Sequence, residues 1–250
     1  MAKPIGSAFK RKEVMKDYYD ELFSDVLSFR EKWEGKIAIK YRVPKEVGYL
    51  IDFLKDKEPN KRSILEIGAG DGFSSKMIIN ALKPKKYVAT DLSEEGVKKI
   101  KSLGIEAKQA DATDLKGFKD NSFDMICCFN LMHHVDNPRK MAQEMLRVTR
   151  KYFLLCEANA TSVPRRLLEL TPRNRRANEN SYTPETYRSF FENEKLAWIK
   201  TKPFMFAFAF TPNVLTNTSI KLSEAFEKVP LIKWQGSSVL IVGEKKTSNK

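Results

Sequence analysis

Three glycines at alternate positions, Gly68, Gly70 and Gly72, stand directly after the apolar run of residues 63–67. Glycine reaches backbone conformations that other residues avoid, and it lets a ligand approach the main chain. Apolar residues at helical spacing resume at once over residues 73–82, which predicts a strand, a turn and a helix. Because the first N–H groups of a helix attract negative charge, this unit predicts a site for a nucleotide-like cofactor.

The spacing of these glycines bears on which cofactor binds. A dinucleotide site places its third glycine where this chain has Phe73, which weakens an NAD interpretation. The acidic Glu66 followed by Gly-Ala-Gly-Asp-Gly instead resembles the first motif of class I S-adenosylmethionine-dependent methyltransferases. The resemblance implies that the methionine carboxylate of the cofactor faces Gly68, Ala69 and Gly70, with its ammonium near Glu66. A turn with a purely structural role is the alternative at this point.

The next acidic residue of interest is Asp91, at the end of a short predicted strand. It lies about 20 residues beyond the glycines, where a carboxylate at a strand tip accepts hydrogen bonds from the ribose hydroxyls. The alternative is that Asp91 caps the following helix. Ser93 is the better cap, because two glutamates follow it in the first turn. We therefore assign Asp91 and its neighbour Leu92 to the cofactor.

Two further strand ends carry candidate cofactor residues. A predicted strand over residues 105–110 is followed by Asp111 and Ala112. The resemblance implies that Asp111 reaches the adenine amino group and that Ala112 leaves room for the ring. A strand-end turn made by Asp111 would look the same and stays open. After the strand predicted for residues 123–129 comes Asn130, past which the sulfonium methyl would point.

The candidate catalytic residues follow Asn130. The segment up to Pro138 contains His133 and His134, the only histidines of the chain, and it resembles the corresponding segment of the UbiE-like, type 11 methyltransferases. An imidazole titrates at about pH 6.5, so either histidine suits a general base for a hydroxyl or an enolisable carbon. The alternative is that both only shape the loop. Glu157, at the end of the next strand, is a second candidate. Adjacent histidines do not readily share an ion, so we expect no metal site.

The order of elements predicts how these residues are positioned. Strands and helices alternate over residues 63–157, which predicts a doubly wound, Rossmann-like parallel sheet. Two more strands, at 196–204 and 238–243, complete seven, the last of them antiparallel. Such sheets bind ligands beyond the carboxyl ends of their strands. The residues that we expect to meet along this edge are Gly68, Asp91, Asp111, Asn130 and Glu157.

The chain outside this sheet predicts two additions. An amphipathic helix over residues 11–33 and a second helix over residues 44–55 form an N-terminal helical extension. We expect the extension to occupy residues 1–58 and the methyltransferase domain residues 59–250. Within that domain, residues 158–195 are predicted to form a helical lid.

Composition places the chain among ordinary globular proteins. Of its 250 residues 42% are hydrophobic and 31% charged, which suits one α/β domain with elaborations. No apolar run is long enough to cross a membrane, and the N-terminus lacks the apolar region of a secretion signal, so we expect a cytoplasmic protein. Cys127, Cys128 and Cys156 lie in strand-like runs, and we expect buried free thiols, the first two on opposite faces of a strand.

Three functional classes follow, each with S-adenosylmethionine as cofactor; the enzymes among them release S-adenosylhomocysteine. The first methylates a small-molecule or lipid-like acceptor, as the type 11 resemblance and the apolar residues Phe204, Phe206, Phe208 and Phe210 favour. The second methylates RNA or protein, as the net charge of +13 and the arginines between residues 165 and 176 favour, although abundant lysine and glutamate also occur in heat-adapted proteins. The third binds the cofactor without catalysis. The sequence gives no oligomeric state.

Overall fold

The computed structural model describes residues 8–24, 35–170, 180–192, 196–207 and 211–246. The predicted helix beyond Ser24, part of the predicted lid and several residues named above lie outside these ranges. No helix in the described part of the chain has the length and apolar character needed to span a membrane. Outside the ranges lie Arg173, Arg175 and Arg176 of the arginine cluster, together with Phe208 and Phe210.

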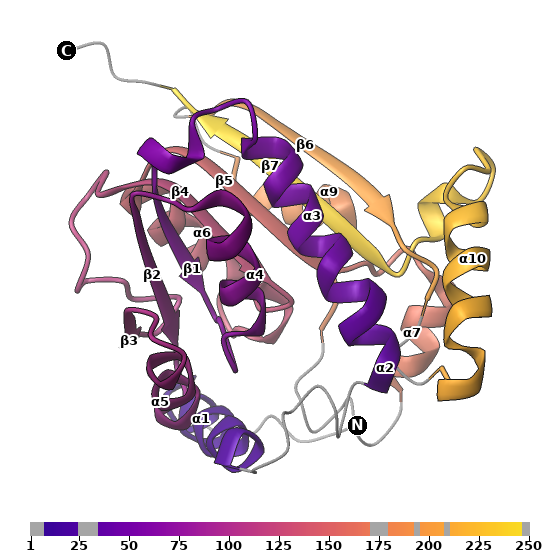
Figure 1. Ribbon diagram of the computed structural model, residues 1–250, viewed down its shortest axis with the longest axis horizontal. Helices are drawn as coiled ribbons and strands as arrows, with labels where there is room; N and C mark the ends of the chain where they lie inside the picture. The colour runs from indigo at the N-terminus through magenta and orange to yellow at the C-terminus, as the bar shows by residue number, and fades with distance from the viewer. Residues whose placement is uncertain (1–7, 25–34, 171–179, 193–195, 208–210, 247–250) are drawn as a thin grey trace.

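In the described part of the chain, seven strands form one sheet in the order β3-β2-β1-β4-β5-β7-β6 (Figure 1). Strands β1 to β5 pair parallel, with one register shift between β4 and β5, and β7 runs antiparallel to both of its neighbours. This confirms the predicted Rossmann-like doubly wound sheet. The strands are β1 (Ser63–Ile67), β2 (Lys86–Asp91), β3 (Ala107–Gln109), β4 (Phe123–Phe129), β5 (Thr149–Ala158), β6 (Leu196–Phe204) and β7 (Ser238–Lys245).

Helices cover both faces of the sheet. Helices α3, α4 and α5 pack on one face, while α6 and α9 pack on the other. Neighbouring strand residues point to opposite faces, so Cys127 lies in the first core layer and Cys128 in the second. The helices are α1 (Ala8–Ser24), α2 (Gly35–Ile37), α3 (Val43–Leu54), α4 (Phe73–Leu82), α5 (Glu94–Ser102), α6 (Pro138–Val148), α7 (Val163–Glu169), α9 (Pro184–Phe190) and α10 (Thr216–Phe226).

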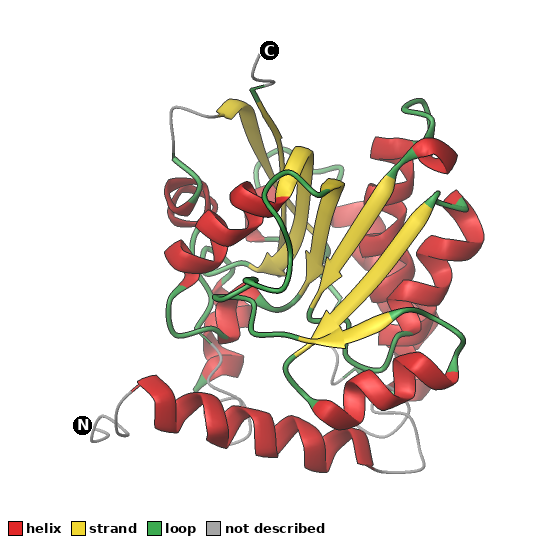
Figure 2. Ribbon diagram, turned by 90° about the vertical axis from the view of Figure 1, so that its left-hand side faces the viewer, coloured by secondary structure: helices red, strands yellow, loops and turns green. Residues whose placement is uncertain are grey.

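The N-terminal extension differs from its prediction in two ways. Helix α1 begins at Ala8, earlier than expected, and lies under the carboxyl ends of β1 to β3 beside α5 (Figures 1 and 2). Helix α3 is preceded by a π-helical turn over Ala38–Arg42, which joins it to α2. Helix α3 packs on α4 through a fully apolar stripe that includes Val47, Leu50 and Leu54, each 0% exposed.

Phe204, one of the phenylalanines expected to favour an apolar acceptor, belongs to the core. Phe204 ends β6, is 0% exposed and packs edge-on against Tyr49, with ring centroids 4.9 Å apart. The prediction was wrong because an aromatic residue in an edge strand gives the same sequence signal whether the helices cover it or leave it open. Phe206 contacts Phe226 of α10 in the same way.

The central sheet has a position that only glycine fits. A Cβ on Gly243 of β7 would lie 2.3 Å from the ring of Phe153, which stacks on Phe191. We expect Gly243→Ala to lower the free energy of unfolding by about 1–3 kcal/mol, as overpacking does. Gly48→Ala is the control, because a Cβ there has nothing within 4 Å, and it should be neutral or stabilise α3 by up to about 1 kcal/mol. Urea denaturation measures both, and equal stability of the two variants would contradict this packing.

Candidate functional site

The glycine turn forms as the sequence predicts. Gly68, Gly70 and Gly72 have φ values of 69°, 59° and 78°, a region that favours glycine. A Cβ on Gly68 would also lie 2.7 Å from the side chain of Leu131, so the turn and the loop after β4 touch. Ala69 is 1% exposed, and its N–H donates to Thr90 of β2. Packing and hydrogen bonds therefore fix the shape of the turn.

Glu66 lies below the turn. Its carboxylate is 1% exposed and accepts hydrogen bonds from Ser74 Oγ at 2.7 Å, from Tyr87 Oη at 2.6 Å and from Ser75 Oγ. These donors hold β1 to α4 and β2. The contact between Glu66 and the cofactor ammonium stays a prediction, and this burial does not favour it.

Asp91 ends β2 beside the turn. One carboxylate oxygen accepts the N–H of Gly70 at 2.8 Å and the other accepts the N–H of Ser93 at 2.9 Å. Ser93 caps α5, as predicted, by accepting the N–H of Gly96. Asp91 is 8% exposed, so most of its carboxylate is covered in this structure. Burial raises its pKa to about 6 against the opposing effect of the two N–H groups.

Leu92, Asp111 and Ala112 are the next candidate cofactor residues along this edge. Leu92 presents its carbonyl to Gln109 Nε2 at 2.9 Å, and Ala112 is 8% exposed in the second core layer. Asp111 accepts hydrogen bonds from the N–H and hydroxyl of Thr113, both at 2.8 Å, and forms an ion pair with Lys12 of α1. Burial would raise the pKa of Asp111, but the hydrogen bonds from Lys12 and Thr113 outweigh it and lower the pKa.

Asn130 follows β4 in a left-handed conformation with φ 55°, which asparagine tolerates. Its amide nitrogen donates to both carboxylate oxygens of Glu46, at 3.0 and 3.1 Å. Glu46 comes from α3, is 0% exposed and also lies 3.7 Å from Arg42. Glu46 was not among the residues predicted for the site. Its signal in the sequence is a glutamate beside Val47, on the apolar stripe of α3.

Glu157 organises the loop that carries the histidines. Its Oε1 accepts the N–H groups of Leu131 at 3.2 Å and Met132 at 2.9 Å, and its Oε2 lies 2.6 Å from His133 Nδ1. Both Glu157 and His133 are buried, at 0% and 2% exposed. With Glu157 ionised, Nδ1 of His133 carries the proton and Nε2 is the basic nitrogen. Glu157 thus orients His133 and is not itself placed as a base.

His134 differs from His133 in its surroundings. Its ring lies 4.1 Å from the His133 ring and 6.1 Å from Tyr19 of α1, which meets it edge-on. His134 is half-buried. The two predicted bases are therefore adjacent, and Glu157 is a partner of His133.

The predicted strand-end residues lie along one edge and are joined by contacts. Gly70 binds Asp91, Leu131 packs on Gly68, and Glu157 holds the loop that begins at Asn130. The expectation that they meet along the carboxyl edge is therefore confirmed. Their individual roles toward a cofactor stay predictions.

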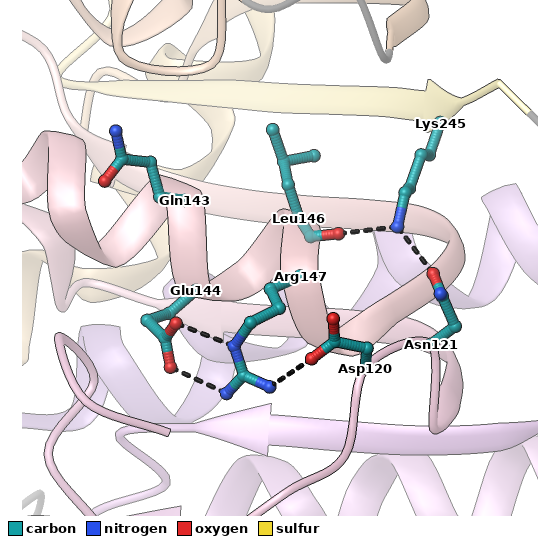
Figure 3. A pocket seen from close by; sticks show the side chains of 7 residues that line it. All are labelled: Asp120, Asn121, Gln143, Glu144, Leu146, Arg147 and Lys245. Carbon is teal, nitrogen blue, oxygen red and sulfur yellow. Dashed lines mark hydrogen bonds and ion pairs between the residues drawn. The ribbon is translucent and has the colours of Figure 1, made fainter. Parts of the chain in front are cut away.

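A pocket at the opposite edge of the sheet does not offer a comparable site (Figure 3). Arg147 is paired with Glu144 at 2.8 Å and with Asp120 at 2.7 Å. Lys245 donates to the carbonyl of Leu146 and to Asn121. These charges brace α6 and β7 against the start of β4, so we assign this pocket a structural role.

The raised pKa of Asp91 predicts a pH effect on stability. Between its ordinary value of 3.8 and about 6, the folded chain binds more protons at this group than the unfolded chain does. The contribution of Asp91 is therefore present at low pH and is lost as pH rises through about 6. In the parent protein the free energy of unfolding should decrease between pH 3.8 and about 6. In Asp91→Asn this decrease should be smaller by about 1–3 kcal/mol. Urea denaturation at several pH values measures it, and Asp52→Asn, at an exposed carboxyl, should follow the parent protein.

Part of the chain is similar in sequence to known methyltransferases. Residues 65–154 match the family model described as a methyltransferase domain. The chain is 29% identical over 93 residues to the phthiotriol/phenolphthiotriol dimycocerosates methyltransferase of Mycobacterium tuberculosis, covering 36% of this chain and 34% of that protein. It is 29% identical over 103 residues to the fatty-acid O-methyltransferase of Mycolicibacterium smegmatis, covering 39% and 37%. The match thus spans about a third of these relatives' length.

The fold is shared more widely than the sequence. The magnesium protoporphyrin IX methyltransferase of Synechocystis, solved with bound SAH, superposes with a TM-score of 0.63 at 12% identity. The superposition covers 94% of this chain and 100% of that one. Residues 65–154 therefore match a methyltransferase domain in sequence, and the chain shares its fold with this solved methyltransferase.

Proposed function

We propose that this protein transfers a methyl group from S-adenosylmethionine to a small-molecule or lipid-like acceptor. The observation that carries the proposal is the joined row of strand-end groups on the carboxyl edge, from the glycine turn to the histidine loop. Open parallel sheets bind their ligands at this edge. The family match at residues 65–154 supports the same activity.

The groups on this edge fit the cofactor. The turn at Gly68 and Gly70 has no room for added side-chain atoms on its Leu131 side, so a ligand meets main chain there. Asp91 and Asp111 supply acceptors for ribose hydroxyls and for the adenine amine. Asn130 stands where β4 ends. When bound, S-adenosylmethionine supplies an electrophilic methyl group on a sulfonium.

The protein's contribution to methyl transfer is mostly alignment. Displacement requires the acceptor atom, the methyl carbon and the leaving sulfur to lie in line, and well-oriented reactions gain effective molarities of about 10⁵–10⁸ M. Asn130 is suited to help set this geometry, because Glu46 fixes its side chain. The loop after β4 is held equally firmly by Glu157.

His133 is the residue best placed to accept a proton from the acceptor. Its Nδ1 lies 2.6 Å from Glu157, which would stabilise the imidazolium that forms when the ring takes up a proton at Nε2. An acceptor whose nucleophile carries no proton would not use this base.

The surroundings of the edge support an apolar acceptor. Helix α7 begins five residues after β5 ends on this edge. The helix exposes Val163 and Leu167 at 59% and 63%, and Leu170, which caps its C-terminus, is 61% exposed. A contiguous patch of exposed apolar side chains marks a site of apolar contact. The two named relatives act on lipids or fatty acids by their names, which agrees with this class of acceptor.

RNA is the second candidate acceptor, and the net charge of +13 favours it. The described part of the predicted arginine cluster weakens it, because Arg165 and Arg166 both pair with Glu169. A cation paired within the chain contributes less to phosphate binding.

Acceptor screening separates the two classes. With labelled S-adenosylmethionine, we expect methyl transfer to fatty acids or hydroxylated lipids that changes little between low and moderate salt. Transfer to RNA through several phosphate contacts would instead fall by about 10³-fold or more between 50 and 200 mM salt. Label recovered only in RNA with that salt dependence would contradict the lipid-like acceptor. No label in any acceptor, together with cofactor binding, would favour the third class, a binding protein without catalysis.

Variants of the histidine pair test the base. His133→Gln should lower turnover by about 10²–10⁴-fold for an acceptor that must lose a proton, with little change in S-adenosylhomocysteine affinity. Glu157→Gln should lower turnover less and shift the pH profile, since it orients His133 through Nδ1. His134→Gln is the matched control and should keep most of the activity. A larger loss in His134→Gln than in His133→Gln would transfer the role to His134.

A further inference from the structure

Helix α1 makes close contacts with the residues that the proposed function gives to the cofactor. It runs beside α5 beneath the ends of β1 to β3 (Figures 1 and 2). Its contacts spread over most of its length, and they reach the adenine side, the start of α5, the glycine turn and the histidine loop. Each of these contacts comes from a different side chain of the helix.

Lys12 occupies the adenine side. Its ammonium pairs with Asp111 and donates to Thr113 Oγ1 at 3.0 Å. The proposed function has Asp111 accept a hydrogen bond from the exocyclic amine of adenine. Lys12 therefore supplies an N–H donor to the same carboxylate, and the two donors compete for it.

Asp20 fixes α1 to the start of α5. It accepts hydrogen bonds from Ser93 Oγ at 2.6 Å and from the N–H of Glu95 at 3.2 Å, while Lys16 holds it at 2.7 Å. A carboxylate at a helix N-terminus is favoured by the dipole of that helix. Burial would raise the pKa of Asp20, but the hydrogen bonds from Lys16, Ser93 and Glu95 lower it.

Aromatic residues of α1 cover the turn. Phe23 is 4% exposed, and its ring lies 3.3 Å from where a Cβ on Gly70 would stand and 3.2 Å from the same position on Gly96. Tyr19 lies edge-on to His134 at 6.1 Å. The main chain that would meet the ligand is thus in contact with a phenyl ring.

We propose that α1 is an autoinhibitory helix that occupies the adenosine half of the cofactor cleft, with Lys12 in the place of the adenine amine. This inference rests on the proposed function for the position of the cofactor. The protein then exists in a closed form, with α1 on the edge, and an open form that accepts the cofactor. The apparent dissociation constant of the cofactor equals the intrinsic one divided by the open fraction.

Two variants open the helix without touching a residue assigned to the site. Lys12→Ala removes the competing donor, and Asp20→Asn weakens the attachment to α5. We expect each to tighten binding of S-adenosylhomocysteine by about 3- to 10-fold in calorimetry, since a partly exposed ion pair contributes about 1 kcal/mol. The matched controls are Lys98→Ala on the exposed side of α5 and Asp17→Asn on the exposed side of α1, which should bind like the parent protein.

Hydrogen exchange gives an independent measurement on the unaltered chain. If the cofactor displaces α1, then amides of residues 8–24 must exchange faster when S-adenosylhomocysteine is added, because binding and closure exclude each other. Protection of α1 by the ligand, or weaker binding in Lys12→Ala, would overturn the inference and make α1 a wall of the occupied site.

Different experimental outcomes would contradict the proposed function and the autoinhibitory role of α1. Binding by the parent protein with unchanged affinity in both variants would remove the autoinhibitory role alone. Absence of binding in the parent protein and in both variants would remove the proposed cofactor, and the inference with it.

Discussion

The carboxyl edge of the sheet depends on buried carboxylates that have enough hydrogen-bond donors. A charged group without donors is costly in a protein interior, so each one gathers the loops around it. Glu66 gathers hydroxyls from α4 and β2, Asp91 gathers the N–H groups of the glycine turn and of α5, and Glu157 gathers the loop after β4. Glu46 does the same for Asn130. The loops that would hold a ligand are therefore shaped before any ligand arrives, which is what alignment of a methyl transfer requires.

The sequence predicts the sheet well, because strands buried on both faces are continuous apolar runs bounded by glycine and acidic residues. It also predicts the candidate residues at strand ends, since parallel strands bring their carboxyl ends together whatever lies between them. It does not predict which groups a carboxylate faces. Asp91 was assigned to the cofactor and is 8% exposed, and Phe204 was expected to favour an apolar acceptor and lies in the core. Both outcomes depend on helices packed from elsewhere in the chain.

The contact between Lys12 and Asp111 is the clearest example of a feature that the sequence does not predict. The two residues are 99 positions apart, and no spacing or composition signals their meeting. Local patterns define elements, whereas the pairing of an N-terminal helix with a strand end is a matter of tertiary packing and charge. The division at residue 58 between an extension and a domain stays a prediction for the same reason, because α3 shares its core layer with the sheet.

The two helices of the N-terminal extension differ in how they are held, and this bears on which of them moves. Helix α3 presents Val47 and Leu50 to the core, and apolar burial of that extent is lost only on unfolding. Helix α1 is held by the polar contacts of Lys12 and Asp20 and by the ring of Phe23. Water or a ligand can make hydrogen bonds in place of those that Lys12 and Asp20 make. Exchanging these polar contacts for those of a ligand costs little net free energy, because hydrogen bonds are replaced rather than lost. A helix attached in this way is suited to reversible closure. Because α1 lies on the edge proposed for the cofactor, its release would control cofactor binding.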